Sequence, residues 1–236
     1  MKVRGGKSIY GASVGILMLD ARFPRIPGDM GNATSWPFPV LYKVVRQATP
    51  DKVVRQGAPG LLDAFVDAAR ELLRDGVDGI TTNCGFLSLY QEELAEAVQA
   101  PVATSSLMQV AMVNQLLPRG KRAGILTISA STLTQQHLEK ANVPSGTPIG
   151  TTEGGSEFTR AILGNELELD VELARRDNVE AALALCRAHP DLGAIVLECT
   201  NMTPYAADIR MATGLPVFSI HNFIGWFQAS LTPRRF

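Results

Sequence analysis

Short apolar runs alternate with longer amphipathic stretches along most of the chain. In residues 60–74 the apolar positions recur with a helical period, and Gly76 then ends the pattern. The pattern predicts strands at 14–19, 77–82, 101–104, 123–128, 194–197 and 217–220, and helices at 60–74, 87–98, 131–141, 157–163, 171–189 and directly after Cys199. Strands separated by helices of this length form parallel βαβ units, so we expect an α/β fold with helices on both faces of its sheets.

Two segments do not fit this alternation. Residues 21–60 contain six of the 14 prolines, together with the stretch "FPRIPGDMGN", and are predicted to form a long functional loop. Residues 144–158, which are rich in Gly, Pro, Ser and Thr, are predicted to form a second loop at the surface.

The second half of the chain repeats the pattern of the first. A shift of 115 positions superposes residues 80–104 on 195–219 without a gap and gives six identities in 25, including Cys84 with Cys199. The runs "GIL" at Gly15 and Gly124 also correspond, at an offset of 109. We infer two similar parallel α/β lobes related by a pseudo-twofold axis, with the active site in the cleft between them.

The repeat places two cysteines at equivalent strand ends. Ligands bind at the carboxyl ends of parallel strands, so Cys84 and Cys199 are expected to approach one cavity from opposite sides. Each precedes a helix, whose first N–H groups can hold a substrate carboxylate and can lower a thiol pKa from ~8.5 into a range of roughly 3.5–7.5. Cys186 lies on the apolar face of its helix and is interpreted as a packing residue.

A thiolate and a thiol on opposite faces of a substrate can invert a stereocentre. One group removes a proton next to the carboxylate and the other returns a proton to the opposite face. Backbone N–H groups that contact the carboxylate would stabilise the charge that develops. The residues therefore favour two-base proton transfer between Cys84 and Cys199.

The motifs "TNCG" and "LECTNM" carry a resemblance to a known family. The chain resembles the aspartate/glutamate racemase superfamily, which includes glutamate, aspartate and hydantoin racemases, maleate isomerase and arylmalonate decarboxylase. Thr200 follows the second cysteine as in the family, whereas Gly85-Phe86 is closer to hydantoin racemases. Asn201 stands where glutamate racemases have His, which favours a substrate other than glutamate.

The resemblance also implies further site residues and a lobe boundary. Its predicted substrate-binding residues are Asn83, Gly85, Thr127, Ser129, Ser131, Thr200, Asn201, Asp20 and Asp29. It implies a protein that needs no cofactor and forms a homodimer or higher homo-oligomer. It assigns residues 1–104 plus 217–236 to the first lobe and 105–216 to the second.

Composition excludes several other classes of protein. The net charge is −1, and no Lys/Arg block or basic stripe suggests a nucleic-acid partner. No stretch approaches the ~18 apolar residues of a membrane span, and a cytoplasmic location is expected. The three dispersed histidines and three cysteines match no metal-ligand spacing.

The sequence therefore predicts a cofactor-independent racemase or isomerase of a small carboxylate, such as an amino acid or a related acid. Alternatives are a cis–trans isomerase of a dicarboxylate that uses one cysteine as a nucleophile, a decarboxylase, a non-catalytic carboxylate-binding module, and a redox disulfide between the two cysteines. The substrate and the role of His221 stay open at this point.

Overall fold

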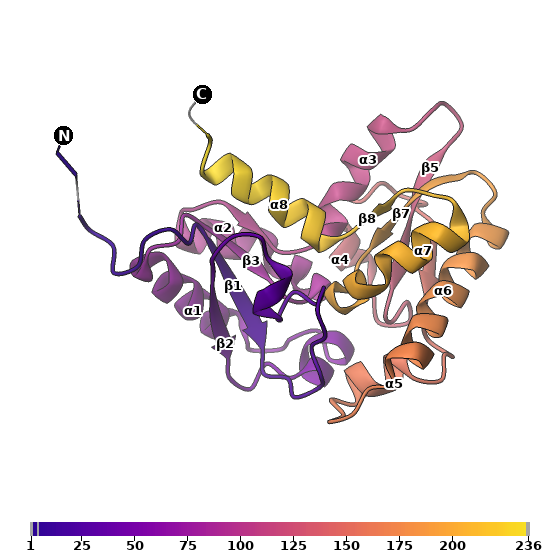
Figure 1. Cartoon of the computed structure of the whole chain (residues 1–236), viewed down its shortest axis with the longest axis horizontal. Helices are drawn as coiled ribbons and strands as arrows, with labels where there is room; N and C mark the ends of the chain where they lie inside the picture. The colour runs from indigo at the N-terminus through magenta and orange to yellow at the C-terminus, as the bar shows by residue number, and fades with distance from the viewer. Residues whose placement is uncertain (1, 4, 235–236) are drawn as a thin grey trace.

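Two four-stranded parallel sheets form the framework of the protein. The computed structural model describes residues 2–3 and 5–234 and has two lobes that lie side by side (Figure 1). The sheet orders are β2-β1-β3-β4 in the first lobe and β6-β5-β7-β8 in the second. The strands are β1 (Val14–Leu19), β2 (Val40–Val45), β3 (Gly79–Thr82), β4 (Val102–Ala103), β5 (Arg122–Thr127), β6 (Ile149–Thr151), β7 (Leu192–Leu197) and β8 (Val217–Phe218). The predicted α/β fold is confirmed.

Helices cover both faces of each sheet. The α-helices are α1 (Leu62–Asp75), α2 (Gln91–Val98), α3 (Val110–Leu116), α4 (Gln135–Lys140), α5 (Phe158–Leu163), α6 (Val171–Ala188), α7 (Ala206–Thr213) and α8 (Ile220–Leu231). Shorter helical turns are η1 (Ala33–Ser35), η2 (Asp51–Arg55), η3 (Gly85–Tyr90), η4 (Ser106–Gln109) and η5 (Thr200–Tyr205). Every residue of β1 and β3 is buried, because parallel strands between two helical layers meet apolar groups on both sides.

The repeat seen in the sequence reappears in the register of the sheets. Gly15 pairs with Ile80 in the first sheet, and Gly124 pairs with Ile195 in the second. The elements η3, α2 and β4 become η5, α7 and β8 after a shift of 115 residues. The two sheets therefore have the same strand order and the same pairing of their central strands.

The lobes exchange helices at their carboxyl ends. After β4, helix α3 packs against β5 of the second lobe, and after β8, helix α8 packs against β3 of the first. In Figure 1, α8 lies over the first lobe although its strand β8 belongs to the second. Phe227 of α8 lies so close to Gly79 that a Cβ there would be 2.6 Å from its ring. The last helix thus lies with the first lobe, whereas strand β8 pairs with β7 of the second lobe, inside the segment that the sequence assigned to the first.

Two strands lie inside segments that the sequence analysis assigned to loops. Strand β2 lies within 21–60 and β6 within 144–158. Both are edge strands, and they occupy equivalent positions in the two sheets. Their residues are mostly half-buried. In β2 the run VLYKVV is interrupted by Lys43, and β6 has only three residues, so neither gives as strong a strand signal as the central strands.

No helix among residues 2–3 and 5–234 combines the length and the apolar character that crossing a membrane would need.

Candidate functional site

The two cysteines that the sequence pairs lie at one cavity. Cys84 follows β3 and immediately precedes η3, and Cys199 follows β7 and immediately precedes η5. Both are buried, and both line the same small cavity at the carboxyl ends of the two central strand pairs. Strands β3 and β7, which precede the two cysteines, are interior strands of their sheets. Because the two strands belong to different lobes, the thiols approach the cavity from opposite sides.

The cavity has mostly apolar walls and a volume of about 20 Å³, which is room for roughly one water molecule. Its apolar residues come from both lobes, and several of those from the first lobe lie within residues 19–54. The lining residues are Leu19, Phe23, Pro50, Val54, Asn83, Cys84, Gly85, Phe86, Ile128, Ile162, Leu163, Glu198, Cys199 and Asn201. Within the described chain, no Lys, Arg or His side chain belongs to this lining.

The two cysteine segments interlock. The Thr200 hydroxyl donates to the backbone oxygen of Asn83 over 2.6 Å, and the Asn83 side chain accepts the backbone N–H of Leu19 at 2.7 Å. Gly85 lies against the residue that precedes the other cysteine, because a Cβ there would stand 2.3 Å from Oε1 and 2.4 Å from the backbone oxygen of Glu198. Only a residue without a side chain allows the two segments to approach this closely.

Burial governs the acidity of both thiols. Burial, with a smaller contribution from the Glu198 carboxyl, raises the pKa of Cys84 to about 12 and the pKa of Cys199 well above its ordinary value. Backbone N–H groups act in the opposite direction, from Phe86 and Leu87 on Cys84 and from Asn201 on Cys199. The helix ends predict lowered pKa values, but at these buried positions the loss of solvent outweighs those N–H groups.

Glu198 is a cavity residue that the sequence analysis did not select. Its side chain is 1% exposed, Oε2 accepts the Thr127 hydroxyl at 2.7 Å, and Oε1 has no hydrogen-bond partner among the described residues. Burial raises the pKa of this carboxyl to about 7. The signal in the sequence is a single charged residue at the end of an apolar strand, "AIVLECT".

Asp29 and Asn201 connect the segment 21–60 to the second cysteine. Cys199 Sγ donates to the Asn201 side-chain oxygen over 3.6 Å, and the Asn201 amide donates to Asp29 at 2.6 Å. Asp29 also accepts Arg25 at 2.9 Å and the backbone N–H of Gly31 at 2.7 Å. Asp29 lies outside the cavity lining and joins this segment to the site.

Other predicted site residues lie further from the cavity. Ser129 donates to the carboxylate of Glu153 at 2.7 Å, and both the backbone N–H and the hydroxyl of Ser131 donate to the same carboxylate. This loop therefore binds a carboxylate, but it is one from the protein itself. Asp20 forms an ion pair with Arg46 at 3.0 Å near the surface.

The remaining cysteine and His221 are separate from the cavity lining. Cys186 is half-buried on α6. His221 stacks on Trp36 with ring centres 4.9 Å apart, and its Nε2 is 2.6 Å from the backbone oxygen of Ser35. Among the residues that the structure describes, no group of three His, Cys, Asp or Glu side chains is arranged to hold a metal ion.

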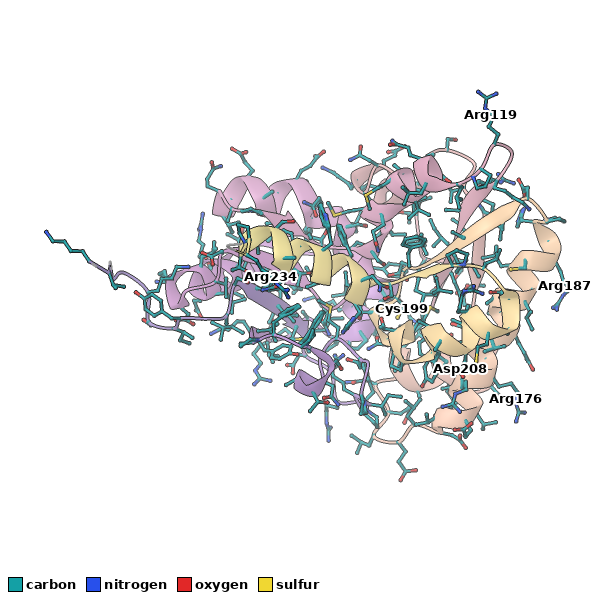
Figure 2. The ribbon with its side chains drawn as sticks, turned by 45° about the horizontal axis from the view of Figure 1, so that its top comes forward. Arg119, Arg176, Arg187, Cys199, Asp208 and Arg234 are labelled. Atoms are coloured by element: carbon teal, nitrogen blue, oxygen red, sulfur yellow. The ribbon has the colours of Figure 1, made fainter. Side chains whose placement is uncertain are left out.

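Positive charge lies away from the thiols. Figure 2 shows Cys199 where the two lobes meet, with Arg119, Arg176 and Arg187 at the outer rim of the second lobe. Arg25 is nearer, with its guanidinium carbon 4.6 Å from the centre of the Phe23 ring, and its charge acts to lower the pKa of Cys84. Its Nη1 is paired with Asp29, and its buried Nη2 has no hydrogen-bond partner among the described residues.

Solved structures with this architecture place the chain in a known class of fold. A double mutant of arylmalonate decarboxylase in a liganded form has a TM-score of 0.63 at 19% identity, covering 94% of this chain and 93% of that chain. A glutamate racemase from Bacillus anthracis has a TM-score of 0.59 at 17% identity over 93% and 82% of the two chains. An aspartate racemase from Picrophilus torridus has a TM-score of 0.56 at 12% identity over 95% and 96%. The two-lobe fold is that of the aspartate/glutamate racemase superfamily, as the motifs predicted.

Sequence relatives define the family more narrowly. No protein-family model matches the sequence. A dimethylsulfoniopropionate lyase from Durusdinium sp. clade D is 30% identical over 219 residues, which cover 89% of this chain and 72% of that protein. Dimethylsulfoniopropionate lyase 7 from Emiliania huxleyi (strain CCMP1516) is 28% identical over 232 residues, covering 93% and 67%. The chain belongs to the family of these lyases, whose members support the prediction that it is an enzyme.

Proposed function

We propose that this protein is a lyase that eliminates a sulfonium group from the β-carbon of a small carboxylate. Dimethylsulfoniopropionate, the compound that appears in the names of the sequence relatives, is a substrate of this kind. The observation that carries the proposal is a small, mostly apolar cavity whose lining has only acidic titratable groups among the described residues: two thiols and one carboxyl. A substrate that brings its own positive charge suits such a cavity better than one that brings only negative charge.

The reaction needs one base. A cysteine thiolate removes a proton from the carbon next to the substrate carboxylate, and the electron pair of that C–H bond forms the carbon–carbon double bond. The C–S bond breaks, and its electrons stay on sulfur. The products are dimethyl sulfide and acrylate, and the proton stays on the cysteine until it passes to solvent.

We assign the base to Cys84. Two backbone N–H groups, from Phe86 and Leu87, favour its thiolate form. Cys199 has one such group and donates its own proton towards Asn201, a contact that suits the thiol. A sulfonium cation bound between them would lower the thiol pKa, because an opposite charge within about 4–6 Å favours the ionised form. Binding of the substrate would therefore help to create the base that attacks it.

Incubation of the protein with dimethylsulfoniopropionate tests the proposal, with dimethyl sulfide measured in the headspace and acrylate by NMR. We expect both products in equal amounts. Cys84→Ala should lower the rate by about 10²–10⁴-fold, the range for loss of a general base. Cys199→Ser, which keeps a donor, should lose less activity than Cys84→Ser.

The control is Cys186→Ala, which removes a thiol outside the cavity lining and should leave the rate unchanged. Full activity in Cys84→Ala would contradict the assignment of the base. The absence of both products with the unmodified protein would contradict the lyase proposal.

Racemisation is a second candidate, favoured by the presence of two thiols at one cavity where elimination needs only one. Enantiopure amino acids and related acids in deuterated water distinguish the two reactions. Deuterium at the stereocentre together with inversion, and no acrylate from the sulfonium compound, would favour two-base racemisation by Cys84 and Cys199.

A further inference from the structure

The cavity holds a carboxylate oxygen for which the protein provides no partner. Oε1 of Glu198 accepts no hydrogen bond from the described residues, although the side chain is 1% exposed. The other oxygen is already occupied by Thr127, and the backbone N–H of Ile128 also favours the ionised carboxyl. An unpaired buried carboxylate is unfavourable by several kcal/mol unless a ligand or a proton compensates it.

The surroundings of Glu198 indicate which ligand would compensate it. The residues that line the cavity include no cationic side chain within the described chain, and Arg25, which packs on Phe23 beside the cavity, pairs with Asp29 rather than with Glu198. A cationic group of the substrate can therefore supply the partner that Glu198 lacks. Glu198 acts on both Cys84 and Cys199, which places its charge within reach of the reacting groups. The aromatic rings of Phe23 and Phe86 belong to the same lining, and aromatic faces attract the methyl groups of onium cations.

We propose that Glu198 binds the positively charged sulfonium group of the substrate through Oε1 and selects onium carboxylates over neutral carboxylates of the same shape. The inference rests on the proposed function for the identity of the cation. Glu198 is then a specificity-determining residue, distinct from the base Cys84.

The reaction itself limits what Glu198 can contribute. The positive charge is full in the bound substrate and disappears as the C–S bond breaks, so the attraction to Glu198 is weaker in the transition state than in the ground state. Interactions of this kind lower KM without raising kcat. Removal of the charge should therefore raise KM for the sulfonium substrate and should not lower kcat.

Two unreactive ligands test the inference by binding alone. The first is 3-(trimethylammonio)propionate, which carries the positive charge, and the second is 4,4-dimethylpentanoate, which has carbon in place of nitrogen and no charge. In calorimetric titration we expect the unmodified protein to bind the cationic ligand more tightly. In Glu198→Gln the preference should fall by roughly 30-fold, the lower range for loss of one partner of a buried charge pair.

The matched control is Glu157→Gln. Glu157 is also a buried glutamate of the second lobe, but its oxygens are paired with Arg160 at 2.8 Å and with the backbone N–H of Asp170 at 2.9 Å, outside the cavity lining. This variant should keep the full preference for the cationic ligand. Thermal unfolding of each variant shows that a loss of preference does not reflect a loss of folding.

The outcomes separate this inference from the proposed function. A preference that Glu198→Gln retains would overturn the role of Glu198 even if the protein forms acrylate. A preference that depends on Glu198 in a protein that forms no acrylate would support the cation site and contradict the lyase reaction. Equal binding of the two ligands by the unmodified protein would also overturn the inference.

Discussion

At the scale of single residues, the close packing of the two cysteine segments depends on Gly85 and Thr200, which have no role in the proposed proton transfer. Gly85 leaves room for Glu198, and Thr200 ties its own segment to Asn83. These contacts join one cysteine motif directly to the other. The geometry of the cavity is therefore sensitive to changes of a single methyl group.

Gly85→Ala should damage both stability and activity. The added Cβ would stand 2.4 Å from a backbone oxygen of Glu198, so one cysteine segment has to move. We expect a loss of about 1–3 kcal/mol of unfolding free energy, as for overpacked cores, and roughly 100-fold lower activity from the misplaced thiols. Thermal unfolding and the acrylate assay measure the two effects.

Gly225→Ala is the matched control, because a Cβ at this position in α8 meets no atom within 4 Å. It should raise stability by about 0.5–1 kcal/mol, since alanine favours a helix interior more than glycine does. An unchanged Gly85→Ala variant would contradict the tight approach of the two segments.

Glu198 should also give stability a specific dependence on pH. Its pKa is raised from an ordinary 4.5 to about 7 in the folded protein, so between these values the folded state holds a proton that the unfolded state has released. Stability from this group is complete below about pH 4.5 and is lost as the pH rises through 7. The thiols Cys84 and Cys199 and the Thr127 hydroxyl are the polar groups that face it.

Glu198→Gln removes this dependence. The unfolding temperature of the variant should match that of the unmodified protein near pH 4.5 and exceed it at about pH 8, as measured by calorimetry at both values. An equal difference at both pH values would show that the Glu198 carboxyl does not titrate in this range.

Residue-level reasoning from the sequence found the cysteines but missed Glu198. The thiols carry a signal because they occur at matching positions of a repeat. The shift of 115 positions superposes Glu198 on Asn83, which carries no charge. The repeat therefore gives no reason to select Glu198. Its importance depends on the missing partner of one oxygen atom, which only the packing of both lobes determines.

At the scale of elements, the segment 21–60 forms part of the cavity wall and closes it. Phe23, Pro50 and Val54 line the cavity, while Asp29 and the stack of Trp36 on His221 hold the segment to the second lobe and to α8. A cavity of about 20 Å³ is smaller than dimethylsulfoniopropionate or an amino acid, so entry of such a substrate requires the cavity walls to move.

His221→Ala tests the attachment of this segment. It removes the stack on Trp36 and the contact with the backbone oxygen of Ser35, which together contribute about 1–2 kcal/mol. The unfolding temperature should fall by roughly 2–8 °C for a chain of this size. Because His221 does not line the cavity, kcat should change little.

A large fall in kcat together with an unchanged unfolding temperature would instead place His221 in the reaction. The comparison with His221→Phe, which keeps an aromatic ring against Trp36, separates the stack from the hydrogen bond. We expect this variant to recover part of the lost stability.

Most of the helices and the central strands were predictable because their apolar patterns reflect burial, but helix α3 was not predicted. The edge strands β2 and β6 were not, since one side of each lacks a neighbouring strand and its residues are mostly half-buried. The repeat could have revealed them, because Val40 and Ile149 are related by the same offset of 109 as the two "GIL" runs.

At the scale of the whole molecule, the duplication explains why two similar segments meet at one cavity. Both lobes have the same strand order, and each provides one thiol, Cys84 after β3 and Cys199 after β7. This symmetry was visible in the sequence. The family resemblance assigned residues 217–236 to the first lobe, but nothing in the sequence analysis predicted helix α3 or its position. Assembly into a homodimer or larger oligomer stays a prediction.

The position of α8 has a consequence for folding during synthesis on the ribosome. Ile220, Ile224 and Phe227 pack in one apolar cluster with Val14 and Ile16 of the first strand. The first strands leave the exit tunnel before this helix is made, so one face of their sheet stays uncovered until α8 emerges. The amino-terminal lobe therefore cannot complete this apolar cluster until the residues of α8 have left the ribosome.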